Sequence, residues 1–499
     1  MNHAGPARYA APIRTAPAQE RQKLALLMEG ATLLLSMIIV WTLSAQVVSP
    51  LWSIVSFCNF VWLCVFLFRV APRAIVIALP YIITRSSTIV ALVLIEFGAE
   101  IPELGTVGTA GTHTASFVFY VAILFGAYAI MFQAFFARTA AAKSDFLTRF
   151  FDRWATLIAM GAIAVIGLVA LWMILRGLIS GFPLLIGADR FAYRRFSADK
   201  IVLYALNLKF IIAYILGFIV FRSPVPHLVK LMAIGLSTLL LLLYFMFGDK
   251  FFTQLAAMSA FFGPYLFMNF ERVKRNIVAF TLAAMVALGA VFSVTWWIYS
   301  DGGAATTAAT LEKLGGRIVG QGELWYVQSY VGAPLLNWDS HLVDRNIQAL
   351  RVKAIDPFAQ RESLGAAYFS NKYAPDTLRA SLARNNGSVT YTMAAEPLGL
   401  AAFGWVGLGV LLVLCALAIS VGNLLIARAI VQRLPLSIIF GAYILIQTQG
   451  MLNQGAPWVV FSIFNLKWLG VIAAIELGLI ALAASQKPKP TSRRRPQWR

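Results

Sequence analysis

Long apolar segments, each close to the length of a membrane-crossing helix, recur through the whole of this 499-residue sequence. Crossing the hydrocarbon core of a bilayer takes about 20 residues of α-helix. Only 12% of the residues are charged, against about 25% in soluble domains. The sequence therefore predicts an all-α integral membrane protein with about twelve transmembrane helices. These lie at 25–48, 51–68, 74–98, 114–137, 155–175, 201–221, 229–247, 251–270, 276–299, 397–427, 434–448 and 458–484.

The basic residues predict how these helices are oriented. With the N-terminus in the cytoplasm, two tails and five connections become cytoplasmic, and every one of the seven is basic. Together they hold 23 of the 41 lysines and arginines, as the positive-inside rule requires. We therefore predict a multi-pass protein of a bacterial inner membrane with both termini cytoplasmic. The net charge of +20 is scattered between apolar segments and does not indicate nucleic-acid binding.

The predicted helices divide the chain into nine followed by three, with a large periplasmic loop between helices 9 and 10. Within that loop, residues 340–355 and 376–384 have helical patterns. The five predicted parts are a cytoplasmic tail (1–24), helices 1–9 (25–299), the periplasmic loop (300–396), helices 10–12 (397–484) and a second cytoplasmic tail (485–499).

Two predicted outer connections carry many charges, against the usual bias. The first, residues 176–200, contains GFPLLIGADRFAYRR (181–195), in which Arg190, Arg194 and Arg195 stand among aromatic residues. Arginine offers a planar fork of donors suited to phosphate and diphosphate oxygens. The pattern therefore indicates an anionic ligand, although arginines and aromatic residues also anchor helices at lipid headgroups.

The second charged connection, residues 300–396, contains GGRIVGQGELWYVQSY (315–330). Its glycines allow close approach of the backbone to a ligand or a neighbouring helix. Arg317 and Glu323 bracket them, and the Trp325 ring could stack on a sugar. A carboxylate here could take a proton from a sugar hydroxyl. The alternative is a structural pair of Arg317 and Glu323 in an interfacial hairpin.

Further candidates follow in the same loop. His341, Arg345 and Gln348 are spaced to share one helical face, and Arg351 lies near it. Arg379 and Arg384 flank the second short helix, and Glu396 stands where the chain re-enters the membrane. Most exposed loop charges are merely solvated, so we expect only two or three of these to be essential.

Charges also occur within the predicted spans. Arg85 and Lys209 would each cost about 2.5–3.5 kcal/mol in a membrane, so each should face a cavity or a partner. Glu96, farther along the same span as Arg85, is a candidate partner. The sequence is compatible with two roles for these charges, a structural ion pair or a place on a substrate pathway.

No cofactor or metal is predicted. The sequence has no P-loop, no dinucleotide-binding glycine motif, no HExxH and no CxxC. Its three cysteines, Cys58, Cys64 and Cys415, all lie in apolar segments and indicate no disulfide framework.

Four segments carry a resemblance to a known family. These are GFPLLIGADRFAYRR, GDKFF (248–252), GGRIVGQGELWY and AEPLGLAAFGWVGLGVLL (395–412). In them, and in its helix count and large late loop, the chain resembles bacterial oligosaccharide repeat-unit polymerases of the Wzy type, which make O-antigen or exopolysaccharide. The superfamily also includes the O-antigen ligases, which have the same layout.

The resemblance implies a GT-C-like, inverting, metal-independent glycosyltransferase. Its donor would be an oligosaccharide on undecaprenyl diphosphate, its acceptor a second lipid-linked repeat unit, and a chain-length regulator a further partner. Glu323, His341 and Glu396 are the candidate bases, in that order. The family's functional arginines correspond to the outer-loop arginines here by region only: Arg190, Arg194, Arg195, Arg317, Arg345, Arg351, Arg379 and Arg384.

Other classes compete with this interpretation. An O-antigen ligase would differ only in its acceptor. A lipid-linked oligosaccharide flippase should show two related halves and short loops, which the nine-plus-three arrangement does not. A protein glycosyltransferase would carry paired acids in a large first outer loop, whereas that connection is very short here.

Overall fold

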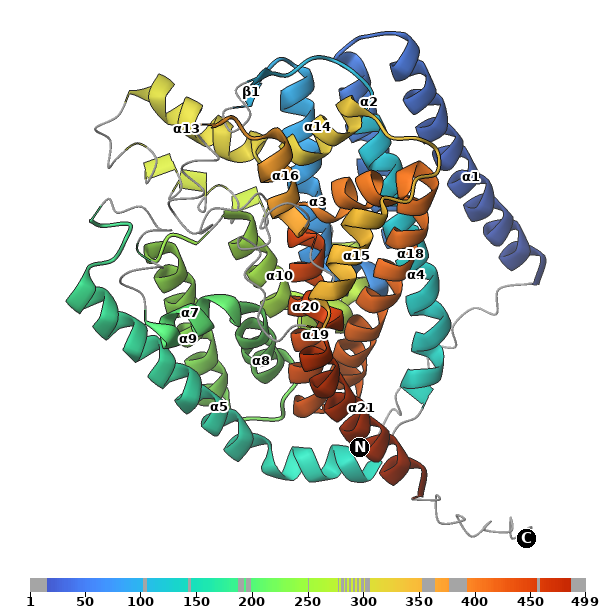
Figure 1. Ribbon diagram of the computed structural model, residues 1–499. Helices are drawn as coiled ribbons and strands as arrows, with labels where there is room; N and C mark the ends of the chain where they lie inside the picture. Colours follow the sequence, from blue (N-terminus) through green and yellow to red (C-terminus); the bar gives the residue numbers. More distant parts are fainter. Residues whose placement is uncertain are drawn as a thin grey trace.

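The computed structural model shows a bundle of long helices, with shorter helices packed over one of its ends (Figure 1). It describes residues 16–101, 106–141, 145–186, 199–249, 251–276, 306–351, 364–376, 393–455 and 458–485, with Tyr193, Ser300 and scattered positions from 278 to 297.

The first four helices pack as neighbours. They are α1 (Ala16–Gln46), α2 (Leu51–Val70), α3 (Pro72–Glu96) and α4 (His113–Ala141). Pro72 occupies the first turn of α3, where its missing N–H costs nothing, so α2 ends and α3 begins almost without a connection. Between α3 and α4, β1 (Glu100–Ile101) and β2 (Thr106–Val107) form a minimal antiparallel pair, a small departure from the all-α prediction.

The next group follows the first along the chain. It comprises α5 (Asp145–Ser180), α7 (Lys200–Asn207), α8 (Lys209–Phe221), α9 (His227–Met246), α10 (Phe251–Met268) and α11 (Phe270–Arg275). The group packs against the first through α10, which contacts α3 and α8. The axes of α7 and α8 meet at an angle of 63°. Lys209 stands at this bend and pairs with Asp249, in the turn between α9 and α10. The expectation that Lys209 has a partner is therefore confirmed.

The predicted periplasmic loop contains four helices within the described residues. These are α13 (Thr307–Val319), α14 (Glu323–Val331), α15 (Ser340–Ala349) and α16 (Gly365–Tyr373). Of these four helices, only α15 was predicted from the sequence. The other predicted helix, at 376–384, lies outside the described residues except for Asp376.

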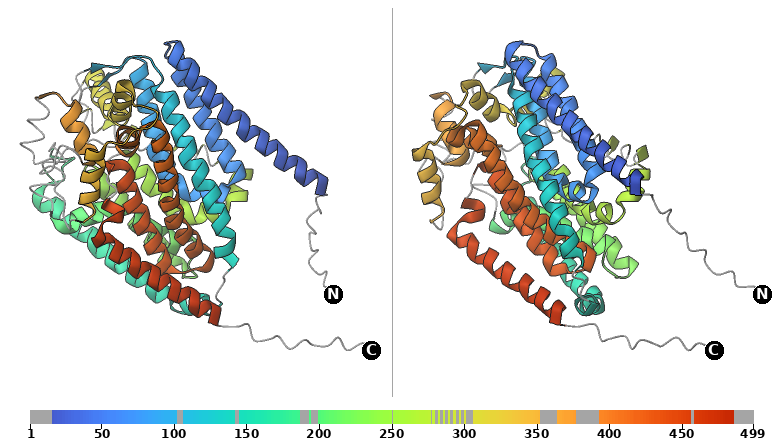
Figure 2. Two further views of the ribbon diagram at one scale, coloured as in Figure 1. Left: turned by 45° about the vertical axis from the view of Figure 1, so that its right-hand side comes forward. Right: turned by 90° about the vertical axis from the view of Figure 1, so that its right-hand side faces the viewer.

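The last helices complete the bundle. They are α18 (Ala395–Gln432), α19 (Pro435–Gln454), α20 (Trp458–Phe461) and α21 (Ile463–Ser485). α18 is kinked at Gly404, whose φ of 72° leaves the helical region. Arg428 of α18 and Glu476 of α21 form a buried ion pair. In both views of Figure 2, α21 ends at the lower side and α1 begins at about mid-height, whereas α13 and α14 lie toward the upper end.

Within the described residues, eight helices are long and apolar enough to cross a membrane, or nine if α7 and α8 form one bent span. Large apolar side chains remain exposed on their outer surfaces, as on α5, where Leu157 and Leu168 are 64% and 67% exposed. Such surfaces are stable only against lipid. The protein is thus a multi-pass helical membrane protein. The predicted spans at 251–270, 276–299 and 458–484 are not among these candidates, and 276–299 falls mostly outside the described residues, so the total of twelve and the five predicted parts stay predictions.

Candidate functional site

The position of Glu323 is set by a close approach of two backbones. α14 begins directly after Gly322, which lies against α3: a Cβ at residue 322 would stand 2.9 Å from Ala91 Cβ and 3.0 Å from Leu92 N. Only glycine permits this contact without displacement. The next residue, Glu323, is 1% exposed. The glycines that indicated close backbone approach therefore place a carboxylate inside the protein, near the end of α3.

Trp325 lies within a buried aromatic cluster beside this carboxylate. Its ring centroid is 5.3 Å from that of Phe117, and it also contacts Tyr120 and Trp405. Its Nε1 donates a hydrogen bond of 2.8 Å to the carbonyl oxygen of His113. Trp325 is 1% exposed and contacts protein side chains in this structure, and its stacking on a sugar stays a prediction.

Glu96 and His113 join the end of α3 to the start of α4 and to α14. Glu96 accepts hydrogen bonds from the backbone N–H of His113 (2.8 Å) and of Thr114 (3.1 Å), and from Thr114 Oγ1 (2.8 Å). The Nδ1 of His113 lies 2.6 Å from Ser329 Oγ on α14. Sequence reasoning missed His113. The available signal was its place at the outer end of one predicted span, beside Glu96 at the outer end of the span before.

Arg85 has a partner other than the one expected. Its Nε lies 2.6 Å from Glu396 Oε1, and both side chains are 1% exposed. Its Nη1 also lies within hydrogen-bond distance of Met393 and Asn453. Glu96 as the partner of Arg85 was therefore wrong, because Glu96 lies about 16 Å farther along the same helix and instead binds the first turn of α4. Arg85 nevertheless has a partner of opposite charge, as we expected for a charged residue within a predicted span.

His341, Arg345 and Arg351 are all exposed, on or next to α15. The Asp339 side chain caps the helix by accepting from Leu342 N at 2.9 Å. Leu342 and Val343 face inward, which leaves the predicted basic face of α15 directed away from the protein core.

The helices that carry the three candidate bases meet around one apolar cluster, here called the satellite cluster. Its members come from α14, α15, α16 and the start of α18: Leu324, Leu342, Val343, Ala366, Phe369, Ala394, Leu398 and Ala402. Each candidate base lies within two residues of a member. The structure thus brings together the elements of Glu323, His341 and Glu396 (Figure 1), although His341 is exposed and the two glutamates are buried.

On α16, aromatic rings surround an exposed lysine that the sequence analysis did not single out. Lys372 Nζ donates to Tyr368 OH at 2.9 Å and lies over the rings of Tyr368 and Tyr373. Burial by itself lowers the pKa of Lys372, but hydrogen bonds to the two tyrosines outweigh it, and the pKa is raised. Tyr373 OH donates to Gln328 on α14 at 2.8 Å, which ties this cation to the element bearing Glu323.

The remaining candidates divide into two groups. Arg317 is exposed on α13. Five predicted binding residues lie outside the described residues: Arg190, Arg194, Arg195, Arg379 and Arg384. Among the described residues, no group of three or more histidine, cysteine, aspartate or glutamate side chains could hold a metal ion.

Fold and site together define a helical multi-pass membrane protein with buried acids near one end of its bundle. The model of a family of unknown function, DUF6418, matches residues 359–472. This segment includes α18, α19 and the Arg85 partner Glu396, but neither Glu323 nor His341. No curated protein and no solved structure matches the chain.

Proposed function

We propose that this protein polymerises undecaprenyl-diphosphate-linked oligosaccharide repeat units at the periplasmic face of a bacterial inner membrane. It would act as an inverting, metal-independent glycosyltransferase with a GT-C-like arrangement of about twelve spans and both termini cytoplasmic. The observation that supports this best is the Glu323 carboxylate, 1% exposed at the start of α14, in the segment between the long helices.

In this proposal Glu323 is the base that deprotonates the acceptor hydroxyl. Such a group typically contributes about 10²–10⁴-fold to the rate when it is within hydrogen-bond reach of the acceptor. Glu323 is positioned by the Gly322 contact with α3 rather than by a flexible loop. Glu396 ranks last because its charge is already balanced by Arg85, and exposed His341 is the reserve.

The leaving diphosphate needs fixed positive charge where its own charge develops. Arg317, on the helix before Glu323, and Arg345 and Arg351, on α15, are exposed and available to an incoming ligand. We assign the same role to the five arginines named above that lie outside the described residues. A chain-length regulator is the further partner that this function implies.

Replacing Glu323 by glutamine tests the proposal, because glutamine keeps the shape but removes the basic oxygen. We expect Glu323→Gln to abolish the polysaccharide ladder on a gel, while single lipid-linked repeat units accumulate in the periplasmic leaflet by mass spectrometry. Glu312→Gln, an exposed glutamate on α13, is the matched control and should give a normal ladder.

Other outcomes would identify other functions. Accumulation of lipid-linked polymer, rather than of single units, would indicate an O-antigen ligase. Accumulation of single units confined to the cytoplasmic leaflet would indicate a flippase. A normal ladder from Glu323→Gln at wild-type protein levels would remove Glu323 as the base.

A further inference from the structure

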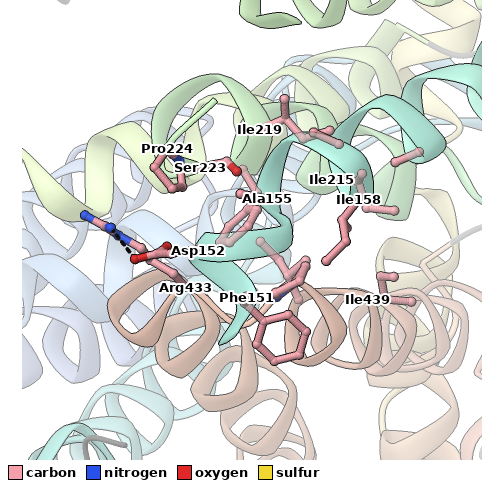
Figure 3. A pocket seen from close by; sticks show the side chains of 15 residues that line it. Phe151, Asp152, Ala155, Ile158, Ile215, Ile219, Ser223, Pro224, Arg433 and Ile439 are labelled. Atoms are coloured by element: carbon pink, nitrogen blue, oxygen red, sulfur yellow. Dashed lines mark hydrogen bonds and ion pairs between the residues drawn. The ribbon is translucent and has the colours of Figure 1, made fainter. Parts of the chain in front are cut away.

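A cavity of about 80 Å³ lies at the end of the bundle opposite α13 and α14 (Figure 3). It stands between the first half of α5, the end of α8 and the start of α19. Apolar side chains from all three helices line most of it, including Ile158, Ala162, Ile215, Ile219, Ile438 and Ile439. A water molecule occupies about 30 Å³ in the liquid, so the cavity is larger than one water. Because apolar cavities stay dry, a short stretch of hydrocarbon suits this space better than water does.

The cavity is open toward the lipid-facing surface. Ile158 and Ile439 both line it, yet they are 37% and 36% exposed. On the next turns of α5, Val165 and Leu168 are exposed apolar residues that would contact bilayer lipid. A lipid chain could therefore enter sideways, without separation of the helices.

Charged groups stand at the rim. Arg433 Nη1 lies 2.9 Å from Asp152 Oδ2, and both side chains line the cavity while remaining about one third exposed (Figure 3). Arg222 lies beside this pair and donates to the carbonyl oxygens of Ile430 and Val431, at the end of α18.

Positive charge exceeds negative charge at this rim. Arg433 pairs with Asp152, and Arg222 interacts electrostatically with both of them, so two arginines stand against one aspartate. A basic rim beside an apolar slot between transmembrane helices is the arrangement that recognises anionic lipid headgroups.

We propose that this cavity binds an anionic phospholipid, with part of an acyl chain among the isoleucines and the phosphate at the arginine rim. The apolar lining selects a chain and the excess of arginines selects a negative headgroup. This site is separate from Glu323 and does not depend on the proposed polymerase function. With the orientation predicted from the charges, the lipid would come from the cytoplasmic leaflet.

Lipid-dependent stability of the purified full-length protein in detergent tests the proposal. A ligand that binds only the folded state raises the unfolding midpoint with concentration. We expect phosphatidylglycerol to raise the midpoint more than phosphatidylcholine with the same acyl chains, and glycerol phosphate to have no effect. If the two lipids raise the unfolding midpoint equally, the effect is general solvation by lipid. If glycerol phosphate raises the midpoint as much as phosphatidylglycerol does, no acyl chain is bound. Either result would overturn the proposal.

Two variants test the two parts of the site. Ala162→Leu fills the cavity, and Ala164→Leu adds the same side chain at an exposed position on the same helix. We expect about tenfold weaker phosphatidylglycerol binding, measured by native mass spectrometry, in Ala162→Leu only. The double variant Arg222→Gln, Arg433→Gln keeps the apolar lining and removes two positive charges from the rim, so it should reduce the difference in affinity between phosphatidylglycerol and phosphatidylcholine. Unchanged binding in both the cavity and the rim variants would overturn the proposal, and the rim variant decides it if Ala162→Leu does not fold.

Discussion

Arg85, in the middle of α3, and Glu396, in the first turn of α18, form an ion pair with 2.6 Å between Nε and Oε1, and each is 1% exposed. The pair joins α3, a largely buried helix of the first half of the chain, to the helix that follows the predicted periplasmic loop. A buried pair of this kind contributes little net stability compared with apolar residues, but loss of one partner leaves an uncompensated charge.

The Arg85–Glu396 pair predicts strong coupling in a double-mutant cycle. Arg85→Leu and Glu396→Leu should each destabilise the protein by about 3–5 kcal/mol, because each leaves the other charge buried alone. The double variant should be less destabilised than either single one. Unfolding of the four proteins in detergent measures the coupling, and additive losses would show that the two charges do not interact.

The contact of Gly322 with α3 predicts that a single methyl group is not tolerated. Gly322→Ala would place its Cβ 2.9 Å from Ala91 Cβ, so α14 must shift. Overpacking of this kind costs about 1–3 kcal/mol. Gly315→Ala is the control, since a Cβ there has no neighbour within 4 Å. Thermal unfolding should separate the two, and equal stability would mean that α14 can move without cost.

The charge distribution predicts the topology. Single cysteines at Ser197 and Ser363 should react with a membrane-impermeant maleimide added to intact spheroplasts, whereas a cysteine at Ser144 should not. The three native cysteines would first be replaced by serine, because Cys58 is exposed. Labelling at Ser144 under these conditions would reverse the orientation.

Bidentate binding of a diphosphate predicts that arginine cannot be replaced by lysine. Arg190→Lys and Arg317→Lys should both impair polymer formation at normal protein levels, because lysine keeps the charge but loses the planar fork. Arg272→Lys, on the predicted cytoplasmic side, is the matched control. Full-length polymer from both outer variants would assign these residues to interfacial anchoring.

The sequence predicted the long helices well because their signal is local. Apolar length alone identifies a span, and Pro72 and Pro435 each mark a helix start. The helices between the long spans were harder to predict: α13 and α14 are short, and glycines separate them. What sets their position is contact with α3 and α4, which lie about 200 residues earlier in the chain.

The partner of Arg85 illustrates the same limit. Glu96 was chosen because it lies in the same predicted span, but eleven residues of helix place it about 16 Å farther along the axis, out of reach of Arg85. Three hydrogen bonds from His113 and Thr114 occupy it instead. Glu396 reaches Arg85 only because α18 packs beside α3, and no local pattern records that packing.

The kink at Gly404 has a mechanical consequence. At about 1.5 Å per residue, a straight helix of the 38 residues of α18 would extend about 57 Å, far more than the hydrocarbon thickness of about 30 Å. The break divides α18 into a short rod bearing Glu396 and a long rod ending near Arg428. The carbonyl oxygen of Pro334 lies 2.5 Å from where a Cβ of residue 404 would stand, and the segment before α15 is hydrogen-bonded to the backbone on both sides of this kink. A side chain at residue 404 would therefore displace the segment that leads into α15, and with it the helix that bears His341.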